Sequence, residues 1–173
     1  METKHLSKIT YNKETKELSG YLIEFNIINK YVDYSDMIDN HSLDHINDDM
    51  INNIIIDINE NQFIILNESD FKYKTEINEK GLKFSMKINT IEKLVIYDKT
   101  TNTRISHNCI DNILHDYYVD FLFIVDKDQF KKQADGTYIR TILKFKKILA
   151  FDLISIGNND NSLDFYKKNI LKK

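Results

Sequence analysis

The chain has 173 residues, which fits one domain that can bury roughly 70% of the surface of its unfolded state. A single cysteine, Cys109, excludes an intramolecular disulfide and favours a reducing compartment. The net charge of −3 argues against wholesale coating of nucleic acid, and the hydrophobic content of 42% is that of an ordinary globular domain.

Two pairs of segments in the N-terminal half are typical of hairpins. Residues 8–12 and 18–28 flank a turn at Asn12-Lys13-Glu14, and the apolar residues 51–58 and 63–66 flank residues 59–62. Between these hairpins a helical spacing of apolar residues follows Ser42, at Leu43, Ile46, Met50 and Ile54. We therefore expect two hairpins and one helix here.

The clearest hairpin lies in the middle of the chain. Apolar and polar side chains alternate over residues 71–77 and again over 82–88, and the connecting Asn-Glu-Lys-Gly is typical of a turn. Residues 92–98 and 103–106 form another pair that extends this meander. The glycines at positions 20, 81, 136 and 157 are expected in turns.

The C-terminal third shows both the helical and the strand spacing of apolar residues. A helix is expected over residues 109–118, and a second one over 162–171 behind Ser162. Residues 119–125 are almost continuously apolar, which predicts an interior strand covered on both faces. Residues 138–156 fit a helix or two strands, and their β-branched and aromatic content favours two strands.

These elements predict one α+β domain over residues 1–173. The sheet is expected to be predominantly antiparallel, a meander of about eight or nine strands, with about three helices. The polar N-terminal segment and the absence of an apolar run of roughly 18 residues predict a cytoplasmic protein without a membrane association. The residue bias follows A+T-rich codons, which is typical of an A+T-rich bacterium, its phage or a large DNA virus.

One stretch of twelve residues resembles the calcium-binding loop of an EF-hand. Its oxygen ligands would be Asp57, Asn59, Asn61 and Glu68. The resemblance fails at Gln62, which stands where the loop needs glycine, and a hairpin turn explains the same residues. We expect neither a metal nor a cofactor.

Three aspartates support an enzymatic alternative. Asp126 and Asp128 form an Asp-x-Asp at the end of an apolar strand, and Asp120 precedes them. With a basic C-terminal third to follow phosphates, they would suit a small metal-dependent nuclease or phosphoryl-transfer enzyme. Solubilising charge at a strand end is the alternative explanation. The pair His41 and His45, and the looser set around His107, Cys109 and His115, offer weaker metal sites.

The charge distribution is the most distinctive feature of the chain. Residues 31–71 carry ten acidic residues and no Lys or Arg, whereas residues 127–173 carry eleven basic and five acidic side chains. The two segments could neutralise each other. Alternatively, the first part could form an acidic surface with aromatic anchors, made of Tyr31, Asp33, Tyr34, Asp36, Asp39, Asp44, Asp48 and Asp49.

The leading functional hypothesis is a non-enzymatic binding protein, such as an inhibitor or an immunity-type antagonist. Its acidic surface would engage a protein partner that has a basic surface. Nucleic acid could bind only through the basic C-terminal third, and the oligomeric state is left open.

Overall fold

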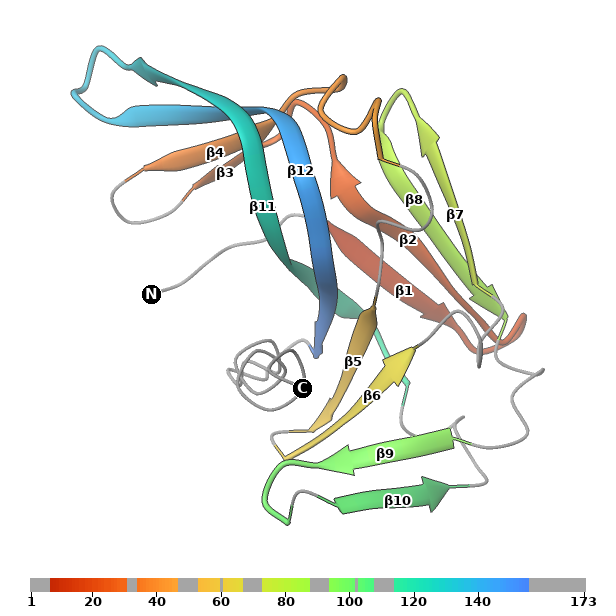
Figure 1. Ribbon diagram of the computed structural model, residues 1–173. Helices are drawn as coiled ribbons and strands as arrows, with labels where there is room; N and C mark the ends of the chain where they lie inside the picture. Colours follow the sequence, from red (N-terminus) through yellow and green to blue (C-terminus); the bar gives the residue numbers. More distant parts are fainter. Residues whose placement is uncertain are drawn as a thin grey trace.

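The computed structural model describes residues 7–30, 34–46, 53–59, 61–66, 73–87, 94–101, 103–107 and 114–155. These residues form twelve strands of one sheet (Figure 1) and contain no helix. The strands are β1 (Lys8–Asn12), β2 (Glu17–Glu24), β3 (Ile28–Lys30), β4 (Ser35–Ile38), β5 (Ile54–Asn59), β6 (Gln62–Leu66), β7 (Tyr73–Asn78), β8 (Gly81–Lys87), β9 (Leu94–Asp98), β10 (Thr103–His107), β11 (Tyr117–Lys132) and β12 (Tyr138–Ser155).

The sheet is curled into a half-barrel, with its strands in the order β10-β9-β6-β5-β12-β11-β1-β2-β8-β7 (Figure 1). Most neighbours are antiparallel. One edge of β12 is shared, because its first part pairs in parallel with β4 and its last part pairs in parallel with β5. The strands β3 and β4 thus form a short ribbon beside the start of β12.

The expected α+β class is wrong, because the segments with a helical spacing fold differently. Leu43 and Ile46 lie in successive turns, in which the amides of Ser42, Asp44 and Ile46 each donate to the carbonyl three residues earlier. Ile54 opens β5, and Tyr117 opens β11. The helix expected over residues 162–171 lies outside the described residues. The described part of the chain has no helix that could cross a membrane.

The four expected hairpins are confirmed as β1–β2, β5–β6, β7–β8 and β9–β10. The meander is wrong, since β9 pairs with β6 and lies far along the sheet from β8. Gly20 is also not in a turn: it lies within β2, where an added Cβ would stand 2.1 Å from the backbone oxygen of Lys8. A glycine inside a strand is typical of such a close backbone approach.

The long hairpin of β11 and β12 stands in the middle of the strand order. Residues 119–125 all belong to β11, but the interior position expected for them is wrong, because β1 pairs with β11 only at Tyr117 and Tyr118, whereas β12 pairs along the whole strand. Their burial on both faces is wrong, since Ile124 is 45% exposed. Residues 138–155 form one strand where two were expected. The pairing of β11 with β12 shifts its register four times between residues 122 and 128. Such bulges bend strands, and Figure 1 shows both strands curving together before they reach their turn.

The main core fills the inner face of the curled sheet. It joins residues from strands that are distant in sequence, such as Ile9, Leu18, Phe84, Phe145 and Phe151. A smaller cluster of Ile55, Phe63 and Ala150 lies on the opposite face. Burial on both faces explains why β5 begins with three consecutive isoleucines, each at most 1% exposed.

Candidate functional site

The far end of the long hairpin carries the most distinctive exposed surface of the described residues. We call residues 126–147, which run from the bend through the turn at 133–137, the arm; they hold seven basic and three acidic side chains. Phe130 is 63% exposed and Tyr138 is 45% exposed. Figure 1 shows the tip of the arm projecting from the sheet beside β3 and β4.

Both exposed rings lie beside cations. The guanidinium carbon of Arg140 is 5.9 Å from the centroid of the Phe130 ring, and the Lys132 Nζ is 5.9 Å from the centroid of the Tyr138 ring. Such contacts contribute about 0.5–1 kcal/mol at exposed sites. They orient each ring at the surface without covering it.

Two ion pairs brace the arm. The Arg140 Nε donates to Asp128 Oδ2 at 2.7 Å, and the Lys144 Nζ lies 2.8 Å from Asp126 Oδ2. The hydrogen bond and charge of Lys144 lower the pKa of Asp126. The two aspartates of the Asp-x-Asp motif therefore each face a cation of β12.

The first described acidic residue of the expected binding surface, Asp36, is not at the surface. It is 7% exposed and lies opposite Arg140 in the parallel pairing of β4 with β12. Burial raises its pKa, although the charge of Arg140 lowers it and that of Asp128 raises it. The pairing places one residue of the acidic segment beside one of the basic segment, and the mutual neutralisation of the two segments stays a prediction.

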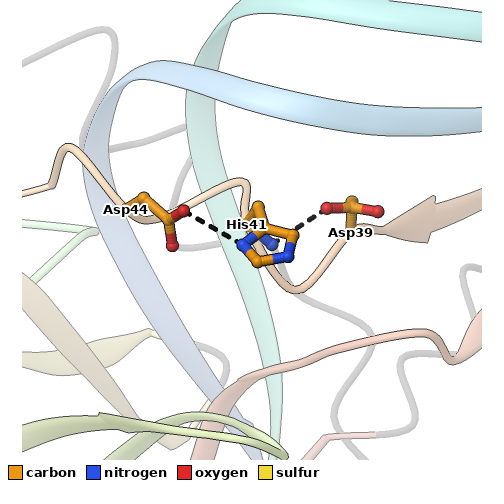
Figure 2. A network of polar contacts seen from close by, with 3 residues as sticks. All are labelled: Asp39, His41 and Asp44. Carbon is orange, nitrogen blue, oxygen red and sulfur yellow. Dashed lines mark hydrogen bonds and ion pairs between the residues drawn. The ribbon is translucent and has the colours of Figure 1, made fainter.

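The remaining acidic surface is the turn that follows β4. Figure 2 shows Asp39, His41 and Asp44 together: the His41 amide donates to Asp39 Oδ1 at 2.9 Å, and His41 Nδ1 lies 3.1 Å from Asp44 Oδ2. The side chains of His41 and Asp44 are 75% and 52% exposed. Tyr34 is half-buried, and the remaining expected contacts lie outside the described residues, namely Tyr31, Asp33, Asp48 and Asp49.

The three aspartates of the enzymatic alternative do not gather at one point. Asp120 precedes Asp126 by six residues of β11, or about 20 Å of extended chain. It lies opposite Asp152 of β12, and this neighbour could not be found from the sequence. Within the described ranges no group of three or more His, Cys, Asp or Glu side chains could hold a metal ion.

The residues with EF-hand spacing lie in the β5–β6 hairpin. Asp57 is fully buried and opposite Phe63, and Asn59 Oδ1 accepts a hydrogen bond from the Asn61 amide at 2.9 Å. The Asn59 side chain also donates to Gln62 at 3.1 Å. Glu68 lies outside the described residues. The hairpin expected for this segment is confirmed.

A serine and a histidine meet where β12 ends. The Nε2 of His115 lies 2.5 Å from the Ser155 Oγ, beside an open depression that Tyr11 and Lys13 also line. The neighbouring Asp116 accepts a hydrogen bond through Oδ1 from the Tyr11 amide at 3.2 Å. This carboxylate oxygen is therefore bound to the backbone of β1. The distance between His115 Nε2 and Ser155 Oγ is that of a nucleophile hydrogen-bonded to its general base. The spacing of His115 and Ser155 in the sequence did not predict this pair.

The arm was also missed from the sequence. Phe130 lies outside the predicted strands and Tyr138 begins one of them, and the exposure of their rings distinguishes them only in the structure. An aromatic residue between charged neighbours, as in Asp-Gln-Phe-Lys-Lys, was the available signal.

Comparison of the chain with protein-family models, with curated proteins and with solved structures finds no match in any of the three.

Proposed function

We propose that the protein is a non-enzymatic binding protein and that its arm engages an anionic partner. The observation that carries this proposal is the exposure of Phe130 and Tyr138, at 63% and 45%, on a ribbon with a net charge of +4. Aromatic anchors ringed by charge are the usual composition of binding surfaces. A cytoplasmic location, which the lone Cys109 favours, belongs to the same proposal.

The sign of the partner follows from which charges are already paired. Asp126 and Asp128 each hold one cation of β12. The remaining acidic residue of the arm, Asp135, accepts hydrogen bonds from the amide and hydroxyl of Thr137. Besides the two cations in these ion pairs, the arm holds five lysines, at positions 127, 131, 132, 146 and 147. Their field attracts an anionic partner.

Heparin binding tests the proposal, because heparin presents negative charge without aromatic groups. We expect wild-type protein to bind immobilised heparin in a salt-sensitive way and the variant Lys131→Gln/Lys132→Gln to elute at lower salt. The variant Asp39→Asn/Asp44→Asn is the matched control, since it also changes two charges, those of the turn that follows β4. Failure of the wild type to bind any polyanion would refute the proposal.

An acidic surface remains a second candidate, favoured by the exposure of Asp44 in the turn of Figure 2. It would engage a basic protein partner, as the sequence predicts. Polylysine separates the two candidates: binding that Asp39→Asn/Asp44→Asn abolishes supports the acidic turn. If that variant instead leaves polylysine binding intact, this second candidate is wrong.

A further inference from the structure

The two exposed rings of the arm share one face. Phe130 lies directly opposite Arg140, and Tyr138 lies directly opposite Lys132. Residues that are opposite in a ladder point to the same side, and positions two apart on one strand do so as well. Phe130 and Tyr138 therefore occupy diagonal positions of one face, with a spacing of about 7 Å.

Lys132 and Arg140 share the face of the rings, and further cations lie on the other face of the ribbon. Lys131 lies opposite Ile139, which pairs with Ser35 of β4, and Ser35 pairs in turn with Lys30 of β3. This row places Lys30 and Lys131 on the face opposite the rings. The charge of Lys30 also acts on Asp135 in the turn of the arm, which places Lys30 near the tip. The tip thus carries cations on both faces of the ribbon.

Two exposed rings and flanking lysines form the combination that binds single-stranded nucleic acid. Every base has a flat face that can stack on an aromatic ring, and lysines along the ribbon attract the phosphates whatever the sequence. A duplex hides the faces of its bases within the stack, and an acidic peptide needs only the lysines. Neither would use rings as exposed as Phe130 and Tyr138.

We infer that the anionic partner of the arm is a single-stranded nucleic acid whose bases stack on Phe130 and Tyr138. This inference rests on the proposed function, that the arm binds an anionic partner, and adds the chemical class of that partner. The contact is tolerant of sequence, since stacking on a ring does not read the hydrogen-bonding edge of a base.

Fluorescence anisotropy with a labelled oligothymidylate of about 15 nucleotides tests the inference. The variant Phe130→Ala/Tyr138→Ala keeps every charge of the arm and removes both rings. Each lost stack is expected to weaken binding about five- to 150-fold, and the salt dependence should stay the same. Tyr118→Ala is the matched control, because Tyr118 is 40% exposed on β11 but lies at the opposite end of the strand.

The lysine variant separates the contribution of charge. Lys131→Gln/Lys132→Gln should lower the slope of log affinity against log salt by about 1.4, or about 0.7 for each lost phosphate contact. Circular dichroism shows whether each variant keeps the fold, so a lost signal from unfolding is recognised.

Several outcomes overturn the inference. It fails if the ring variant binds oligothymidylate as tightly as wild type, or if a duplex of the same length or polyglutamate binds as well as the single strand. In these cases retained heparin binding leaves the proposed function standing. If wild type binds neither heparin nor oligothymidylate, the proposed function fails and the inference with it.

Discussion

Replacement of Gly81 by alanine is expected to destabilise the fold strongly. Gly81 begins β8 with φ of +151°, and an added Cβ would stand 1.9 Å from the Ile23 oxygen and 2.9 Å from its carbonyl carbon. Both atoms belong to the backbone of β2, which pairs with β8 here and with β1 at residues 17–20. No side-chain rotation can relieve such a contact, so β2 and β8 have to separate.

The magnitude follows from two contributions. A non-glycine residue at this positive φ costs about 1–3 kcal/mol. Separation of the strands at Gly81 and Glu24 loses ladder hydrogen bonds worth about 1 kcal/mol each. We therefore expect Gly81→Ala to lower the free energy of unfolding by at least about 3 kcal/mol, a large share of the 5–15 kcal/mol typical of a domain.

Urea unfolding followed by circular dichroism measures this loss. Gly136→Ala is the matched control, because Gly136 has φ of +88° but its added Cβ would meet no atom within 4 Å. The control should lose only the backbone cost of about 1–3 kcal/mol. Equal losses in the two variants would refute the steric reasoning at Gly81.

Further predictions concern packing and pH. Phe151→Ala should cost about 3–5 kcal/mol in urea unfolding, because Phe151 is fully buried and packs 5.6 Å from Phe121 between ring centroids. Phe130→Ala should cost no more than about 1 kcal/mol, because the exposed ring loses only its contact with Arg140; similar losses in the two variants would contradict the burial of the one and the exposure of the other. The pKa of Asp36 is raised from 3.8 by burial, so its contribution to stability is present below that value and is lost as pH rises through the folded-state pKa. Asp36→Asn should therefore gain stability relative to wild type as pH rises above 3.8 in parallel urea titrations, and a relative loss would show that the charge of Arg140 outweighs burial. Lys144→Met should change the free energy of unfolding by no more than about 1 kcal/mol, because both members of its ion pair are exposed by 40% or more, and a larger loss would show that the pair holds the bend of β11 and β12.

The hairpins could be predicted because their information is local. In β8 the alternation of Leu82, Phe84 and Met86 with polar residues, together with the preceding turn, needs no knowledge of the rest of the chain. The helix predictions were wrong because the structure of these segments depends on distant parts of the chain. Tyr117 fits a helical stripe with Leu114, but its partner in the sheet is Ile9, which is more than a hundred residues away. Long-range pairing overrides a local period.

The strand order and the arm needed information that the sequence does not carry locally. Nothing in residues 94–98 indicates that β9 pairs with β6, since an apolar strand of this kind could pair with any other strand of the sheet. The exposure of Phe130 depends on the bend of β11, and that bend arises from bulges distributed over both strands. Buried Asp36 illustrates the same limit, because its surroundings depend on the parallel pairing of β4 with β12.

An NMR titration of isotope-labelled protein with oligothymidylate tests the central claim most directly, because it locates the binding surface without any substitution. The account predicts that the largest shifts occur at Phe130, Lys131, Lys132 and Tyr138, at the tip of the arm. Shifts centred on the turn of Asp39 and Asp44, or on the depression beside Ser155, would contradict it.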